Sequence, residues 1–287
     1  MPDPETIELL DALSVGAPDV LFHYTTATGL TGIITSKALW ATSIHHLNDE
    51  SELQLALQLA DLYLQETQQK AVGPRRELLD AIADHLKRVS QINICVFSLS
   101  AARDLLSQWR AYCAEGGYAI GFNSARLAEI AAKQGFRLAC CLYDERRQQQ
   151  FVRDLVNSYL AGFDDALAGR VPSPNQVDRI AERFATHFVQ LAPLLKHKSF
   201  EEEREWRLVS EPLDVAHSQM KYRPSRGVVL PYFEISLSEM NPLELPEVMV
   251  GPMPDRRLAI HSLSNFLSKC GVVDWTVTES TTPYRNW

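Results

Sequence analysis

The sequence predicts one α+β domain over residues 1–287, in which a mixed or antiparallel sheet is assembled from strands that are distant along the chain. Short apolar runs typical of strands occur near the beginning, in the middle and in the last third of the sequence. Between them, segments 51–90 and 145–196 carry apolar residues at helical spacing. This alternation favours a single sheet core with two helical-pair insertions over two domains in series.

The individual elements follow from these runs and from the turn residues between them. Strands are predicted at 18–26, 39–43, 91–99, 118–123, 136–143, 205–210, 226–235, 246–251 and 272–279. Shorter helices are predicted at 28–36, where Thr28 is a candidate N-cap, at 103–114 and at 255–270. Breaks at 73–74 and 171–174 divide each insertion into a pair of helices.

Composition and charge narrow the possible classes of function. Hydrophobic residues make up 46% of the chain and charged residues 22%, as in an ordinary globular protein, and no apolar run reaches the roughly 18 residues of a membrane span. The 28 basic and 36 acidic residues give a net charge of −8, which argues against binding to nucleic acid through a broad basic surface. We therefore expect no membrane partner.

The cysteines and the N-terminal residues indicate a cytoplasmic protein. The five cysteines are odd in number and form no Cys-x-x-Cys pair, which favours buried free thiols in a reducing compartment. The first residues, MPDPETIELLDALS, are acidic and lack the basic start and long apolar core of a signal peptide.

The familiar catalytic and nucleotide-binding motifs are absent from the sequence. It contains no Gly-x-Gly-x-x-Gly after a strand, no P-loop, no His-Glu-x-x-His and no Gly-x-Ser-x-Gly. His45 and His46 are adjacent, so in a strand their rings point to opposite faces, which is poor geometry for binding one ion. We expect no metal site.

Four polar clusters lie at predicted strand ends or turns, where sites are commonly built. They are His23-Tyr24-Thr25, Asn48-Asp49-Glu50, Ser98-Leu99-Ser100 with Gln108, Trp109 and Tyr112, and the run from Phe200 to Arg207. In the last cluster, strand alternation places Glu203, Glu205 and Arg207 on one face and Trp206 and Leu208 on the other, buried face. The charged face is interpreted as a solvated stripe in preference to the wall of a polar cleft, because runs of charge are usually exposed.

The other clusters also have structural interpretations. A strand-end histidine such as His23 is often satisfied by a backbone carbonyl, and Trp109 and Tyr112, three residues apart on a helix, are more often core residues. The segment 48–50 is most simply the cap of a helix that begins near residue 51. A functional interpretation requires that His23, Glu205 and one of the two helix aromatics line the same cleft.

In their order along the chain, these clusters resemble a bacterial family of uncharacterised proteins, DUF2971. The resemblance rests on short motifs that span nearly the whole sequence: Phe22-His23-Tyr24-Thr25, Leu39-Trp40, Leu47-Asn48-Asp49-Glu50, Phe97-Ser98-Leu99-Ser100, Gln108-Trp109-Arg110-Ala111-Tyr112, Gly117-Tyr118-Ala119-Ile120-Gly121-Phe122, Glu203-Arg204-Glu205-Trp206-Arg207 and Pro283-Tyr284-Arg285. The family name assigns no activity.

A more distant likeness concerns the order of three features. A strand that ends in a histidine, a central serine and aromatic segment, and a late strand with Glu-x-Glu are similar to the order found in ADP-ribosyltransferases. This resemblance implies cleavage of the nicotinamide–ribose bond of NAD, as substrate, and transfer of ADP-ribose to a protein or nucleic-acid acceptor, in a toxin or defence role.

The same resemblance implies roles for individual residues. Glu205 would stabilise an oxocarbenium-like transition state, Glu203 would orient or deprotonate the acceptor, and His23 would bind ribose hydroxyls. The further residues implied in binding the nucleotide are Tyr24, Trp109 or Tyr112 as stacking rings, Arg207 or Arg110 at the pyrophosphate, and Thr25, Ser98 and Ser100, with Asn48, Asp49 and Glu50 as additional candidates.

Two other functions remain open from the sequence. One is a ligand-sensing or partner-binding protein that uses the same cleft without chemistry. The other is a hydrolase or nuclease in which Asp49, Glu50, Glu203 and Glu205 surround a divalent ion. Hydrolysis of NAD separates the enzyme from the binding protein, and dependence on magnesium or manganese indicates the metal-dependent alternative.

Overall fold

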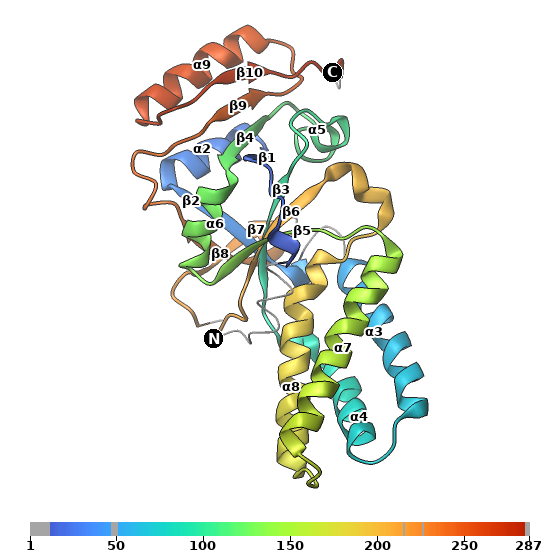
Figure 1. Cartoon of the computed structure of the whole chain (residues 1–287). Helices are drawn as coiled ribbons and strands as arrows, with labels where there is room; N and C mark the ends of the chain where they lie inside the picture. Colours follow the sequence, from blue (N-terminus) through green and yellow to red (C-terminus); the bar gives the residue numbers. More distant parts are fainter. Residues whose placement is uncertain (1–11, 47–50, 215, 226, 285–287) are drawn as a thin grey trace.

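One branched sheet organises the fold in the computed structural model, which describes residues 12–46, 51–214, 216–225 and 227–284. Within these residues ten strands run in the order β10-β9-β4-β1-β3-β2-β8-β7, and β6, with β5 beside it, joins β3 (Figure 1). The strands are β1 (Val20–Thr25), β2 (Ala38–Ser43), β3 (Cys95–Ser100), β4 (Tyr118–Asn123), β5 (Phe136–Cys140), β6 (Glu205–Ser210), β7 (Met220–Ser225), β8 (Val228–Ser236), β9 (Glu247–Val250) and β10 (Val277–Glu279). The α+β class and the mixed sheet built from distant strands are confirmed.

Strand β3 is the branch point of this sheet. Along one edge, its residues 96–100 pair with β6. Along the other edge, residues 95–96 pair with β2, whereas only Ser100 pairs with β1. On the far side of β1 the sheet continues with β4, and on the far side of β2 it continues with β8. The sheet therefore forks between β1 and β2. The fork leaves residues 97–99 without a strand partner on this edge among the described strands.

Three helices cover one face of the sheet. They are α2 (Ala27–Ser36), α6 (Ser124–Ala132) and α9 (Arg256–Lys269). Their apolar side chains share a core with alternate residues of the central strands, including Phe97, Trp206 and Leu208. The prediction that Trp206 and Leu208 lie on the buried face is confirmed.

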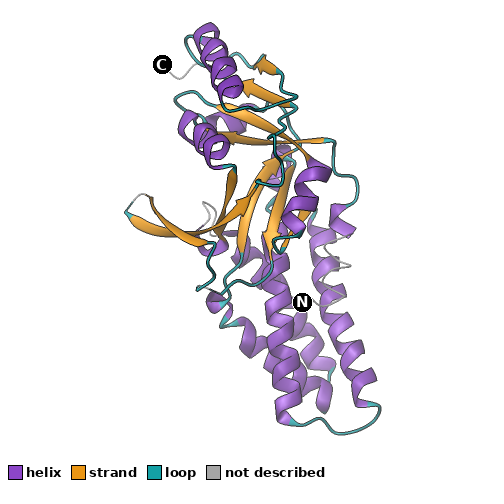
Figure 2. Cartoon of the chain, turned by 90° about the vertical axis from the view of Figure 1, so that its left-hand side faces the viewer, coloured by secondary structure: helices purple, strands orange, loops and turns teal. Residues whose placement is uncertain are grey.

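Four longer helices form a bundle that extends away from the sheet (Figures 1 and 2). They are α3 (Ser51–Lys70), α4 (Pro74–Leu86), α7 (Glu145–Leu167) and α8 (Pro174–Leu191), so the predicted helical pairs are confirmed. Their core includes Val96, Ala139 and Val209 of the sheet, which makes the bundle continuous with it. The expectation that the pairs pack around the sheet is wrong, because they form one bundle that extends away from it.

A short helix, α5 (Leu106–Tyr112), lies on the same face of the sheet as the bundle, but over β1 and β4. Four 3-10 helices complete the described structure: η1 (Ile44–His46), η2 (Val89–Gln91), η3 (Ala192–Leu194) and η4 (Lys198–Glu203). No helix in the described part of the chain has both the length and the apolar character needed to cross a membrane. The five cysteines are free, and three of them are buried.

Local differences from the predicted elements have identifiable causes. Helix α6 and strand β7 were not predicted: α6 is short, and β7 is a polar edge strand that contains a proline. The N-cap of α2 is Thr26, whose hydroxyl accepts the Gly29 N–H, and not Thr28. The last predicted strand is reduced to Val277–Glu279.

Replacing Trp206 with alanine should destabilise the fold. The indole is 7% exposed within the sheet core, and a cavity of this size costs about 3–5 kcal/mol when the surroundings cannot collapse. Urea denaturation should measure this loss, while Tyr222→Ala, at a ring that is 57% exposed, should change the free energy of unfolding by less than about 0.5 kcal/mol. Equal stabilities for wild type and the Trp206 variant would contradict the assignment of this face to the core.

Candidate functional site

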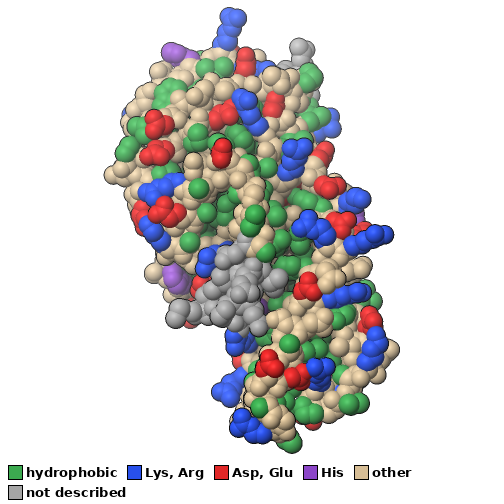
Figure 3. All heavy atoms as spheres, in the orientation of Figure 1, with side chains coloured by type: hydrophobic (Ala, Val, Ile, Leu, Met, Phe, Trp, Pro, Cys, Tyr) green, Lys and Arg blue, Asp and Glu red, His purple; other side chains and the backbone are tan. Residues whose placement is uncertain are grey.

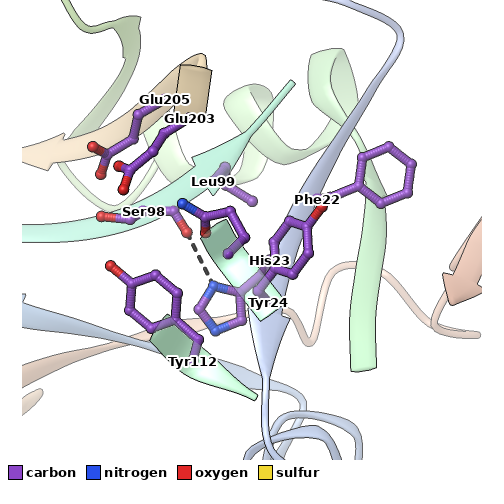
Figure 4. Close-up of a pocket in the computed structure, with 9 residues that line it drawn as sticks. Phe22, His23, Tyr24, Ser98, Leu99, Tyr112, Glu203 and Glu205 are labelled. Carbon is purple, nitrogen blue, oxygen red and sulfur yellow. Dashed lines mark hydrogen bonds between the residues drawn. The ribbon is translucent and has the colours of Figure 1, made fainter. Parts of the chain in front are cut away.

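The candidate site is a pocket of about 350 Å³ at the fork between β1 and β2. Five elements contribute to its wall (Figure 4). The lining residues are Phe22, His23 and Tyr24 of β1, Ser98 and Leu99 of β3, Gln108 and Tyr112 of α5, Glu203 of η4 and Glu205 of β6. His23, Tyr112 and both glutamates therefore line one pocket, which is the geometry that the functional interpretation of the sequence required.

His23 supplies a hydrogen bond at the edge that the fork leaves open. Its Nδ1 lies 3.0 Å from the backbone oxygen of Ser98, and its ring stacks on Phe97 with 4.4 Å between centroids. Because a carbonyl oxygen only accepts, Nδ1 carries the proton and Nε2 presents a lone pair. Burial lowers the pKa of His23 to about 4, against the opposing effect of the Ser98 bond, so the ring is neutral near pH 7. The carbonyl contact expected for a structural histidine is present, and the ring also lines the pocket.

Tyr24 and Trp109 fix α5 on β1. The Tyr24 hydroxyl donates to the Ala102 carbonyl and accepts the Leu105 N–H at the start of the helix. Trp109 is fully buried against the Tyr24 ring, and its Nε1 donates to Asp104. Trp109 is therefore a core residue, and the suggestion that it stacks on a ligand is wrong.

The face of α5 that meets the pocket carries Gln108 and Tyr112. These residues are four apart, so they share one side of the helix, whereas Trp109 points into the core. Tyr112 is 41% exposed, and burial of its hydroxyl end, with the charges of Glu205 and Glu203, raises its pKa. In Figure 4 the hydroxyl of Tyr112 points towards the two carboxylates.

Gln108 belongs to one of the polar clusters of the sequence, but no role was predicted for it. Its side chain is only 7% exposed, lines the pocket and makes no hydrogen bond within the described chain. Its amide faces the pocket, where it remains open to solvent or to a ligand. The spacing of four residues from Tyr112 was the sequence signal that could have assigned Gln108 to the pocket side of the helix. Gln108 thus presents both a donor and an acceptor to whatever occupies the pocket.

Glu205 and Arg207 belong to a buried cluster of charges behind the pocket. Arg207 donates to both carboxylate oxygens of Glu205, and Lys196 donates to one of them. Arg207 also donates to both oxygens of Glu52, at the start of α3, and to the carbonyl of Pro193. The interpretation of a solvated stripe is wrong, because the Arg207 guanidinium is buried and donates to Glu205 and to acceptors that lie far from it in the sequence.

These contacts set the charge state of Glu205. Burial by itself raises the pKa of Glu205, but the charges of Arg207 and Lys196 outweigh it and lower this pKa to about 2. Arg207 is 3% exposed and is absent from the pocket wall, so it cannot reach a pyrophosphate as the sequence suggested. The partners Glu52 and Lys196 carried no sequence signal, since Glu52 lies 155 residues from Arg207.

Glu203 occupies a different position from the one predicted. It ends η4, and Arg204, with φ of 43°, turns the chain before β6 begins, so strand alternation does not orient Glu203. One carboxylate oxygen accepts a 2.6 Å hydrogen bond from Lys196, and the other has no hydrogen bond within the described residues. Burial raises the pKa of Glu203, against the effect of Lys196. Glu203 is therefore the carboxylate with an uncommitted oxygen in the pocket wall.

The remaining predicted residues are distributed as follows. Ser98 lines the pocket, whereas the Ser100 hydroxyl donates to the backbone carbonyl of Glu203 and supports the turn. Arg110 lies outside the pocket wall, over the ring of Tyr284, and Thr25 also lies outside it. Asn48, Asp49 and Glu50 lie outside the described residues.

Of the four carboxylates that the metal-dependent alternative invoked, Asp49 and Glu50 lie outside the described residues, and the structure describes only Glu203 and Glu205. Lys196 and Arg207 occupy the oxygens of Glu205 that a cation would need. Among the described residues, no group of three or more His, Cys, Asp or Glu side chains is arranged to hold an ion.

The stability of the protein should depend on the ionisation of Glu205. Its pKa is about 2 in the folded protein and near 4.5 in an unfolded chain, so the ion pairs stabilise the fold above pH 4.5 and are lost as the pH falls towards 2. The contribution is on the order of 3 kcal/mol. The difference in unfolding free energy between wild type and Glu205→Gln should therefore shrink between pH 5 and pH 2 in urea titrations. A difference that stays constant with pH would contradict the buried ion pairs.

Comparison with models of protein families supports the resemblance seen in the sequence. Residues 108–208 match the model of DUF2971, which is described as a protein of unknown function. Searches of curated proteins and of solved structures found no match. The matched segment begins on α5 at Gln108 and ends in β6 at Leu208, so it contains Tyr112, Lys196 and both pocket glutamates. The match supports the resemblance to DUF2971 over about a third of the chain.

Proposed function

We propose that the protein is an ADP-ribosyltransferase-like enzyme, which cleaves the nicotinamide–ribose bond of NAD and transfers ADP-ribose to an acceptor. The observation that carries the proposal is the Glu203 carboxylate, with one oxygen free in the wall of a pocket that also presents His23 and Tyr112. The resemblance in the order of these features to ADP-ribosyltransferases gives the proposal its reaction class.

The pocket offers groups that match the nicotinamide end of NAD. Its volume of about 350 Å³ includes the open space at its mouth, so the pocket can enclose only a small part of a dinucleotide, such as the nicotinamide ring. The half-exposed ring of Tyr112 offers a stacking surface. The amide of Gln108 can pair with the carboxamide of nicotinamide, since each has a donor and an acceptor.

Glu203 would provide the chemistry in this pocket. As the bond between ribose C1′ and the nicotinamide nitrogen breaks, its electron pair leaves with nicotinamide and positive charge develops on the sugar. An uncommitted carboxylate oxygen beside the sugar stabilises that charge. The acceptor then forms a bond to C1′, and its proton passes to Glu203, whose raised pKa suits a general base. Glu205, neutralised by Arg207 and Lys196, would hold Lys196 in place.

The alternative of a binding protein rests on the buried cluster of Glu205, Arg207 and Lys196. Both oxygens of Glu205 and the guanidinium of Arg207 are satisfied within the protein, as in a rigid recognition site that performs no chemistry. Binding of NAD without release of nicotinamide, with acceptors from a cell extract present, would favour this alternative.

Replacing Glu203 with glutamine should abolish most of the proposed activity. The change keeps the size of the side chain but removes its charge, so nicotinamide release should fall by at least about a hundredfold, the scale of one well-placed electrostatic group. The matched control is Glu202→Gln, because Glu202 is exposed on the same 3-10 helix. Nicotinamide release is followed by chromatography. Equal rates for wild type and Glu203→Gln would remove Glu203 from the mechanism.

Replacing His23 with alanine should weaken binding as well as rate. The neutral ring presents Nε2 as an acceptor for a ribose hydroxyl, so its loss should raise the KM for NAD by about tenfold, the scale of one hydrogen bond. His46→Ala, at an exposed histidine, serves as the control. An unchanged KM in the His23 variant would contradict its role in holding the substrate.

A further inference from the structure

A stacked cluster of aromatic rings and an arginine lies on the arm of the fork formed by β2, β8 and β7. The Trp40 platform, as we call it, consists of Trp40, Tyr232 and Arg223. The rings of Trp40 and Tyr232 lie 4.8 Å apart, and the guanidinium carbon of Arg223 lies 5.4 Å and 5.9 Å from their centroids. Tyr232 is buried, whereas Trp40 is 39% exposed. The indole of Trp40 is therefore partly exposed to solvent, while Tyr232 and Arg223 pack against it.

Arg223 has hydrogen-bonding capacity that the described chain leaves unused. Its Nε is buried without a partner, and Nη2 makes a single long contact of 3.4 Å to the Thr42 hydroxyl. Its neighbour on the same face, Lys221, is instead paired with Glu234 at 2.7 Å. A phosphate cannot reach the buried Nε, but a guanidinium whose terminal nitrogens make one long contact, beside an exposed ring, is suited to a phosphate next to a base.

The platform and the pocket lie on the same face of the sheet. Thr42 pairs with Val96, so Trp40, two residues before Thr42, and Ser98, two residues after Val96, share the face of that pair. Ser98 lines the pocket, and it lies on β3 where β2 turns away. Trp40 therefore stands across the fork from β1, on the arm that ends in the projecting hairpin of β7 and β8 (Figure 2).

We infer that the Trp40 platform binds the adenine and adjoining phosphate of the same dinucleotide whose nicotinamide end occupies the pocket. Adenine would stack on Trp40, and Arg223 would donate to the pyrophosphate. The pocket is too small for both halves of NAD, so the second half must lie against a neighbouring surface, and the platform carries the complementary charge and ring. This inference rests on the proposed function for the identity of the ligand.

The test measures binding of AMP and of nicotinamide mononucleotide separately, by calorimetry, to the full chain. Trp40→Ala should weaken AMP binding by about tenfold or more, the scale of losing one base-stacking ring, and Trp40→Phe should restore most of it. The matched control is Tyr222→Ala, an exposed ring on the opposite face of β7. Neither variant should change the binding of nicotinamide mononucleotide, which occupies the pocket.

Several results would overturn the inference. AMP affinity that is the same in wild type and Trp40→Ala would do so, as would a short single-stranded oligonucleotide that binds the platform more tightly than AMP. Cleavage of NAD by wild type with an unchanged KM in Trp40→Ala would reject the platform and leave the proposed function standing. Trp40-dependent AMP binding in a protein that releases no nicotinamide would reject the proposed function and retain the platform.

Discussion

The buried hydrogen bonds of Arg207 are the interaction on which both the pocket and the helical bundle depend. The guanidinium joins Glu205 on its own strand to Glu52 at the start of α3 and to the Pro193 carbonyl after α8. Removal of a guanidinium from water costs several kcal/mol, and only a complete set of acceptors offsets that cost. Because the acceptors come from both helical insertions, the cluster fixes the bundle on the sheet beside the pocket.

The same cluster shifts the pKa values of Glu203 and Glu205 in opposite directions, although a single residue separates them. Glu205 lies within β6, where the strand directs it towards Arg207, and its pKa falls to about 2. Glu203 precedes the strand, accepts its hydrogen bond from Lys196 among the described residues, and has a raised pKa. The left-handed turn at Arg204 creates this difference, since a strand that continued through it would place both carboxylates in one environment.

The sequence allowed the prediction of most elements because their signals are local. Strands 118–123 and 205–210 match the structure, as do the four bundle helices within a few residues. The burial of Glu205 and Arg207 could not be predicted, because their partners lie on other elements and a charged run is usually solvated. No role was predicted for Gln108 for a related reason: its place in the pocket wall follows from the packing of α5 on the sheet.

The fork explains why a pocket exists at this place. In an unbroken sheet, a neighbouring strand would bond to the edge of β3 at residues 97–99, and side chains would cover both faces. Here β1 and β2 diverge, so the Ser98 carbonyl turns to His23 for its hydrogen bond. The neutral imidazole of His23, the amide of Gln108 and the carboxylate of Glu203 then surround one opening. Because the two strands diverge, a side chain and not a neighbouring strand bonds to the Ser98 carbonyl, and the space beside it is open to a ligand.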